Sequence, residues 1–167
     1  MGAADRTLSL ARLVAILLPV ALLGGAIGSQ YLGGLTPCEM CMWQRWPHVA
    51  AIFVALAAIV VRGNRFMSAV LVALAAMAIA TSGAIGVAHA GVEYRWWEGF
   101  TSCTTLRPEG GSMLEAIMNA PLVRCDQAQW TLFGVSLAGF NAVFSLGGAL
   151  VIALLLAAGA DHDPFHQ

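Results

Sequence analysis

The residues best suited to chemistry are four cysteines, two of which stand close together. Cys38 and Cys41 form a C-x-x-C pair within the string PCEMCMWQRWP, residues 37–47. Two thiols at this spacing can close a small disulfide or bind a metal ion. The pair immediately precedes a long uncharged stretch, so any helix that follows would begin near Cys41.

Two neighbouring features favour redox chemistry for this pair. A helix beginning near Cys41 would place that sulfur at the positive end of the helix dipole, which stabilises a thiolate. Arg45 follows one helical turn later and adds a permanent positive charge. An interfacial arginine that simply extends to water is the plain alternative for Arg45. Beside a C-x-x-C pair, we expect it to stabilise negative charge on Cys41 and on a bound electron acceptor.

The second pair of cysteines, Cys103 and Cys125, is separated by 21 residues. As a static cross-link, a disulfide closing a loop of that size contributes roughly 3 kcal/mol in the chain-entropy model. All four thiols could instead hold one zinc ion, although only one of the two pairs has tight metal-ligand spacing. A third interpretation is a relay in which one cysteine pair passes electrons to the other through mixed disulfides.

The composition places these cysteines in a membrane protein. The chain has 167 residues, of which 59% are hydrophobic and only 10% charged, with a net charge of −1. A typical soluble domain is about 25% charged, so this composition argues strongly against an ordinary soluble enzyme, and the high hydrophobic content excludes intrinsic disorder. All eight basic residues are arginines scattered along the chain, which leaves no basic block for nucleic acid.

Gaps between charged residues predict four transmembrane helices in one domain, residues 1–167. A span needs roughly 20 apolar residues, and the predicted spans are 11–31, 44–61, 66–90 and 132–158. The second is the shortest, and its alternative is a re-entrant or interfacial helix. The first is expected to be an anchor rather than a signal peptide, because no clean cleavage site follows it. The predicted fold is therefore an all-α, four-helix transmembrane bundle.

An even number of spans puts the loops 32–43 and 91–131, which hold every cysteine, on one side of the membrane. The termini and the short turn 62–65 lie on the other side. Arg62 and Arg65 are concentrated in that turn, which favours both termini inside by the positive-inside rule. Cysteines exclusively outside agree with the oxidising conditions that disulfides need.

The chain resembles the DsbB family of bacterial inner-membrane thiol:quinone oxidoreductases. The resemblance rests on CEMCMWQR (residues 38–45), on Cys103, and on CDQAQWTLFGVS (residues 125–136) leading into the last span. It implies a bacterial inner-membrane protein with cytoplasmic termini and periplasmic cysteine loops. It also implies that the chain reoxidises a periplasmic DsbA-like dithiol protein of thioredoxin fold and passes the electrons to ubiquinone or menaquinone.

The resemblance further implies a role for each candidate residue. Cys103 would be attacked by the reduced partner, and Cys125 would be released and could pair with Cys38. Cys41 would be the thiolate facing the quinone, with Arg45 beside the ring. His89, near the outer end of the third span, is similar in position to a quinone-pocket histidine of the family.

Three alternatives stay open at this level. One is a DsbB-like paralogue that serves a dedicated oxidase. Another is an enzyme of the vitamin K epoxide reductase type, although that class places its C-x-x-C late in the bundle. The non-enzyme alternative is a membrane protein with structural disulfides or zinc.

Several weaker patterns give further expectations. The apolar positions of residues 112–120, with a capping box from Ser112 to Glu115, predict a short interfacial helix in the second loop. Trp96 and Trp97 are expected to be interfacial anchors, and His48 a capping or interfacial residue. The small-residue strings 24–28 and 82–86 predict close helix packing.

Overall fold

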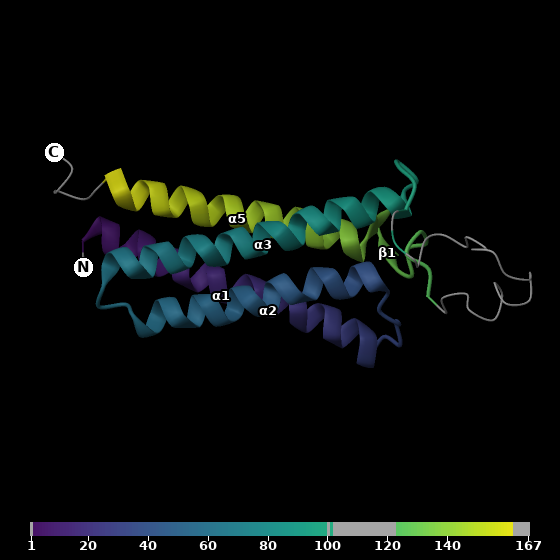
Figure 1. Ribbon diagram of the computed structural model, residues 1–167, viewed down its shortest axis with the longest axis horizontal. Coiled ribbons are helices and arrows are strands. Elements are labelled where there is room, and N and C mark those ends of the chain that lie inside the picture. The colour runs from purple at the N-terminus through teal and green to yellow at the C-terminus, as the bar shows by residue number, and fades with distance from the viewer. Residues whose placement is uncertain (1, 100, 102–122, 162–167) are drawn as a thin grey trace, which may run out of the picture.

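The computed structural model describes residues 2–99, 101 and 123–161, and four long helices dominate it. They are α1 (Ala3–Tyr31), α2 (Glu39–Val60), α3 (Arg65–Glu93) and α5 (Leu137–Asp161), with a small hairpin of β1 (Thr131–Leu132) and β2 (Val135–Ser136) before α5. All four helices are long and apolar enough to cross a membrane. The helices run side by side (Figure 1), so the predicted four-helix bundle is confirmed. The predicted interfacial helix at 112–120 lies outside the described residues.

The helices differ from the predicted spans at the end that holds the cysteines. Helix α2 begins at Glu39 rather than near residue 44, because the Cys38 sulfur caps it by accepting a hydrogen bond from the Cys41 N–H at 3.2 Å. Cys41 therefore lies inside the first turn of the helix. Helix α5 begins at Leu137 rather than residue 132, since the hairpin occupies residues 131–136. The 22 residues of α2 form a full-length helix, not a re-entrant one.

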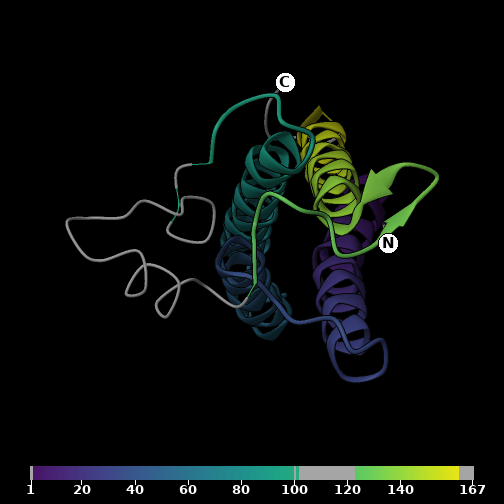
Figure 2. The ribbon, with the colours of Figure 1, turned by 90° about the vertical axis from the view of Figure 1, so that its right-hand side faces the viewer.

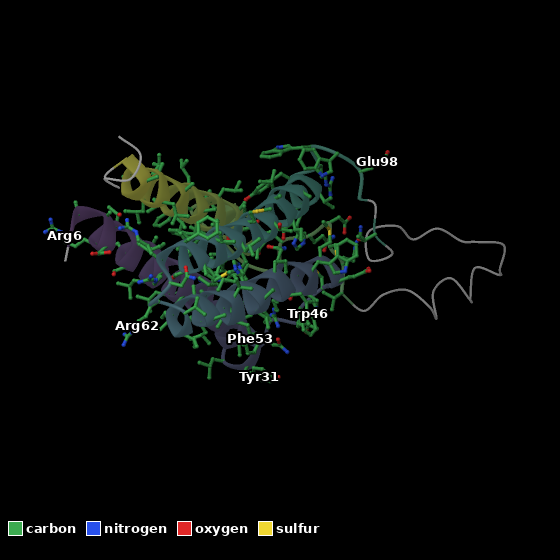
Figure 3. The ribbon with its side chains drawn as sticks, turned by 60° about the vertical axis from the view of Figure 1, so that its left-hand side comes forward. Arg6, Tyr31, Trp46, Phe53, Arg62 and Glu98 are labelled. Carbon is green, nitrogen blue, oxygen red and sulfur yellow. The ribbon has the colours of Figure 1, made fainter. Side chains whose placement is uncertain are left out.

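With an even number of helices, the first and last helices have their outer ends on the same side of the bundle. Both chain ends and the turn between α2 and α3 lie at one end, and the hairpin and the start of α2 lie at the other (Figures 1 and 2). Figure 3 shows Arg6 and Arg62 at the first end and Glu98 at the second. The described cysteines Cys38, Cys41 and Cys125 thus share one end, which we call the thiol end.

Small side chains fill the interior of the bundle, and large ones face outward. The buried cluster is rich in alanine, whereas Phe53, Val60 and Met77 are each at least 65% exposed. This arrangement suits a lipid environment, where close van der Waals packing rather than apolar burial holds helices together. The buried cluster comprises Leu8, Ala11, Ala15, Ala51, Ala55, Ala58, Val72, Ala75, Ala76, Ile79 and Ile152.

The two glycine-containing strings behave differently. A Cβ on Gly83 would lie 2.9 Å from Leu146, and one on Gly86 would lie 3.0 Å from the Ala138 carbonyl oxygen. The string 82–86 is therefore the contact between α3 and α5, as predicted. In contrast, a Cβ on Gly24 or Gly28 would meet no described atom within 4 Å. The prediction of close packing was wrong for the string 24–28, because that face of α1 leaves open space.

The hairpin is held by a turn in which both central residues have positive φ. Leu132 pairs with Val135, and the two residues between them, Phe133 and Gly134, have φ of 52° and 79°. This is the pattern of a type I′ turn, which matches the twist of a two-residue hairpin. The Tyr94 hydroxyl donates to the Gly134 carbonyl at 3.1 Å and accepts from the Ser136 N–H at 2.8 Å. The end of α3 is thereby fastened to the start of α5.

Replacing Gly86 by alanine should destabilise the bundle by about 1–3 kcal/mol, because the added methyl group meets backbone atoms that cannot move aside. Gly28→Ala is the matched control, and it should be neutral or stabilising by about 0.5–1 kcal/mol through helix propensity. The measurement is unfolding in mixed detergent micelles. Equal stabilities for the two variants would contradict this description of α3 against α5.

Candidate functional site

Cys38 and Cys41 are in direct contact at the start of α2. Their Sγ atoms are 2.8 Å apart, and both are free thiols. Cys38 is buried, and the hydrogen bond to Cys41 together with burial raises the pKa of the Cys38 thiol. In the reduced pair, Cys38 therefore keeps its proton and donates it to the Cys41 sulfur. The two sulfurs are close enough to form a disulfide with little movement.

A cavity of about 250 Å³ opens beside this pair. It reaches from the cysteines toward the bundle interior, and its walls come from all four helices. Helices α1 and α5 contribute mostly apolar residues to its lining, whereas most of the ionisable residues come from α2 and α3. The lining includes Gly25 and Ala26 of α1, Cys41 and Arg45 of α2, His89 and Glu93 of α3, and Ala138 and Phe140 of α5.

Arg45 lies on the cavity wall, but hydrogen bonds to α1 hold its side chain. Its Nη1 donates to Gln30 Oε1 at 2.7 Å and its Nη2 to the Ala26 carbonyl at 3.1 Å. These bonds use two of the five N–H donors of a guanidinium. The side chain thus spans from α2 to α1 and brings a fixed positive charge to the cavity that Cys41 also lines.

Hydrogen bonds determine which nitrogen of His89 carries the proton. Gln44 Nε2 lies 3.2 Å from the Met40 carbonyl oxygen, which can only accept, so this atom is the amide NH₂ group. The same NH₂ is 2.8 Å from His89 Nδ1, which must therefore be the acceptor. A neutral His89 then carries its proton on Nε2. That N–H faces Cys38 Sγ at 3.6 Å and Glu93 Oε1 at 3.7 Å.

A buried polar network continues from Gln44 into the bundle. Asn141 of α5 donates from Nδ2 to Gln44 Oε1 at 2.8 Å and accepts on Oδ1 from His48 Nε2 at 2.9 Å. Ser82 and Ser145 add hydrogen bonds to the same group. His48 is 3% exposed, so the expectation of a capping or interfacial histidine was wrong. The residue joins α2 to α3 and α5 from inside.

Cys38, Cys41 and His89 also resemble a metal-binding group, since their ligand atoms lie within 4.8 Å of one another. The hydrogen bonds oppose that use. Coordination through His89 Nε2 would require the ring proton on Nδ1, but Nδ1 already accepts from Gln44. Gln44 is not free to reverse, because Met40 and Asn141 determine its orientation. The site is arranged for two thiols beside a hydrogen-bond donor.

Cys125 lies beside the pair although it is 84 positions further along the chain than Cys41. It is fully buried, forms one small core cluster with Cys38 and Met40, and is disulfide-bonded. Its neighbours Arg124 and Asp126 form an ion pair in which Arg124 Nε donates to Asp126 Oδ1 at 2.8 Å. These hydrogen bonds lower the pKa of the Asp126 carboxyl. Cys103 lies outside the described residues.

A family comparison agrees with this arrangement. The model of the family described as "Disulfide bond formation protein DsbB" matches residues 8–155. The chain belongs to the DsbB family. It is thus a multi-pass membrane protein of that family, and its four apolar helices fit the assignment.

The chain is also similar to a curated protein from Rickettsia prowazekii. "Uncharacterized protein RP370" of Rickettsia prowazekii (strain Madrid E) is 22% identical over 149 residues, covering 86% of this chain and 85% of the relative. No solved structure matches the chain. These comparisons assign no substrate to the chain, so its specific chemistry is inferred from the residues of its own site.

The structure brings together Cys38, Cys41, Arg45 and His89, all of which the sequence indicated. Sequence reasoning missed Gln44, Asn141 and Glu93, which orient or face the same cavity. One usable signal was present for Asn141, because an amide inside a predicted span needs a partner and often marks a functional site. Glu93 lies just beyond the predicted third span, residues 66–90, at the end of an uncharged stretch.

Replacing Gln44 by glutamate should move the ring proton of His89 from Nε2 to Nδ1, because a carboxylate at position 44 accepts a hydrogen bond where the amide donates one. The measurement is the pair of ¹⁵N chemical shifts of the His89 ring, assigned with a His89→Asn variant. Gln127→Glu adds the same charge elsewhere on the cavity wall and should leave the tautomer unchanged. An unaltered tautomer in the Gln44→Glu protein would refute the assignment.

Proposed function

We propose that this chain is a membrane thiol:quinone oxidoreductase. It would reoxidise a DsbA-like periplasmic dithiol protein and pass the electrons to ubiquinone or menaquinone in the bilayer. The observation that supports this most directly is the free Cys38–Cys41 pair opening onto a cavity within an apolar bundle. Electrons from an aqueous dithiol need such a place to reach an acceptor that dissolves in lipid.

The cavity has the chemical character that a quinone head group needs. Its volume of about 250 Å³ lies just below the usual range of small-ligand pockets, roughly 300–1,000 Å³. Apolar side chains such as Phe140 can contact a flat ring, and Arg45 offers charged donors to a carbonyl oxygen. When bound, the quinone would supply a sink for two electrons and two protons. Cys41 would be the sulfur that faces it.

The position of Cys125 supports electron delivery to the pair. By family resemblance, the reduced partner attacks Cys103 and releases Cys125 as a thiolate. Because Cys125 and Cys38 belong to one buried cluster, the released sulfur would lie beside the next cysteine of the relay. Thiol–disulfide exchange requires this adjacency, since a thiolate must reach the sulfur it attacks.

The proposed orientation places the thiol end in the bacterial periplasm and both termini in the cytoplasm. The short α2–α3 turn carries Arg62 and Arg65, and Arg65 also pairs with Asp5 of α1 at 3.6 Å. Arginines concentrated in a short turn favour the cytoplasmic side. The oxidising periplasm would then keep the cysteines available for disulfide exchange.

Quinone reduction by a reduced DsbA-like protein should cease in Cys41→Ser, because no disulfide can form next to the quinone. Arg45→Ala should raise the KM for quinone by about 10- to 100-fold, the usual effect of losing a hydrogen bond to a charged group. The measurement is quinone absorbance during steady-state turnover in detergent or nanodiscs. Arg62→Ala removes an exposed arginine at the opposite end and should retain wild-type kinetics. Normal turnover by Cys41→Ser would refute the proposed function.

In a Cys125→Ala variant, the free thiol of Cys103 should attack the disulfide of the oxidised partner and hold the partner as a mixed disulfide, because the Cys125 thiol that would displace the partner is missing. The measurement is a non-reducing gel followed by mass spectrometry of the linked peptides, which also identifies the partner oxidase. A Cys103→Ala, Cys125→Ala double variant should form no such complex. A partner linked instead to Cys38 would contradict the assigned order of exchange.

A further inference from the structure

Glu93 is a buried acid in the cavity wall, and the proposed electron transfer gives it no role. Its side chain is only 7% exposed, it lines the cavity with Cys38 and Cys41, and its Oε1 lies 3.7 Å from His89 Nε2. Ser136 hydrogen-bonds the Glu93 carboxyl group, whereas the other oxygen, Oε2, has no hydrogen-bond partner among the described residues. A buried ionised carboxylate is costly unless it is well paired, so the protonation state of Glu93 must depend on its surroundings.

The N–H of His89 faces several acceptors, among them the backbone of Cys125, and it can donate fully to only one of them at a time. The single proton on Nε2 faces both Cys38 Sγ at 3.6 Å and Glu93 Oε1 at 3.7 Å. Nδ1 is occupied by the Gln44 amide, so the ring cannot take a second proton without losing that bond. His89 therefore acts as a donor, and the group able to take up a proton beside it is Glu93.

The charges around the cavity restrict how much negative charge the site can hold. The ionisable residues that line it are Cys38 at the cap of α2, Cys41, Arg45 and His48 from α2, His89 and Glu93 from α3, and Arg124 from the segment before α5. The cavity residues of α1 and α5 in the described chain add no ionisable group. Arg124 is already paired with Asp126, which leaves Arg45 as the cation deep in the site. A single cation in a largely apolar cavity can balance one negative charge. A second negative charge in the site would therefore be unfavourable.

We propose that Glu93 is a redox-coupled proton carrier for the Cys38–Cys41 pair. When the pair is a disulfide, Glu93 is ionised and holds the N–H of His89. When the pair is reduced, Cys41 becomes the thiolate, and Glu93 takes up a proton so that the site still holds a single negative charge. This inference deepens the proposed function, since it rests on redox cycling of the pair.

The atoms and electrons of the step balance. The reduced site contains the Cys38 thiol, the Cys41 thiolate and the Glu93 carboxylic acid. Oxidation forms the Cys38–Cys41 S–S bond and breaks the Cys38 S–H and Glu93 O–H bonds. Two electrons from the sulfurs and the two released protons convert the quinone to its hydroquinone, and Glu93 is left as the carboxylate. The net charge of these three residues is −1 before and after.

The test measures how many protons accompany reduction of the pair, with neither quinone nor partner present. The protein is the full chain with Cys103→Ser and Cys125→Ser, so that only Cys38 and Cys41 titrate against a thiol redox buffer. With Glu93 present, two protons per disulfide should shift the half-reaction equilibrium of the pair 100-fold per pH unit near neutrality, once the two protons that the buffer thiols release are counted, so the equilibrium measured directly against that buffer should not change with pH. In Glu93→Gln, only the Cys38 proton remains, so the shift should fall to tenfold per pH unit, a loss of about 30 mV per pH unit for a two-electron couple.

Glu98→Gln is the matched control, because Glu98 is an exposed acid at the same end of the bundle. It should keep the 100-fold dependence. The proposal is overturned if Glu93→Gln also keeps it, if Glu98→Gln lowers it equally, or if the protein with Glu93 intact shows only a tenfold dependence. Failure of the quinone assay with a normal result here would refute the proposed function and leave the proton coupling intact.

A second measurement covers the case in which Glu93→Gln does not fold. Reduced-minus-oxidised infrared spectra of the Glu93-containing protein should show a carboxylic acid C=O band gained on reduction and a carboxylate band lost. Glu98→Gln should leave that band in place. Spectra without such a band would overturn the proposal regardless of any variant.

Discussion

The structure depends on one constraint, which is that polar groups inside an apolar bundle must satisfy each other. Water is excluded from such an interior, and an unpaired polar group there costs several kcal/mol. The hydrogen bonds from Ser145 through Asn141 and Gln44 to His89 meet this requirement in one connected chain. Because each member determines the orientation of the next, the chain ends with a single defined N–H beside the cysteines. The chemistry of the thiol end is therefore prepared by residues deeper in the membrane.

The same constraint explains why the pair lies at the start of a helix, with Cys38 as its cap and Cys41 in its first turn. Cys38 replaces the usual oxygen cap of a helix with a sulfur, so the free N–H of Cys41 is satisfied and the two sulfurs are brought into contact. The position also lies where an aqueous loop meets apolar helices. Glycines 24 and 28 leave open space along α1, whereas glycines 83 and 86 close α3 tightly on α5. The contact between α3 and α5 is thus tightly packed at these glycines, whereas α1 has open space beside Gly24 and Gly28.

Membership of the DsbB family and the geometry of the site each support the proposed oxidoreductase. The family match covers residues 8–155 and concerns the whole bundle. The site geometry concerns a handful of side chains, among them Glu93 and His48. The proposed oxidoreductase follows from both lines of support. The proton coupling follows from the geometry alone.

The sequence by itself determined the bundle, the grouping of the cysteines and the C-x-x-C pair beside Arg45. These features follow from local properties of the chain. Long uncharged stretches predict the spans, and an even number of spans places the two cysteine loops on the same side of the membrane. The four-residue spacing of Cys41 and Arg45 places them on one face of a helix. Only the tertiary structure decided which polar residues meet. Asn141 and Gln44 are 97 positions apart in the chain but form a hydrogen bond. Glu93 lines the same cavity as the cysteines because α3 packs against α2 with this face turned toward the cavity. Spacing along one helix says nothing about the rotation of its neighbour, so the tautomer of His89, the burial of His48 and the place of Glu93 became visible only in three dimensions.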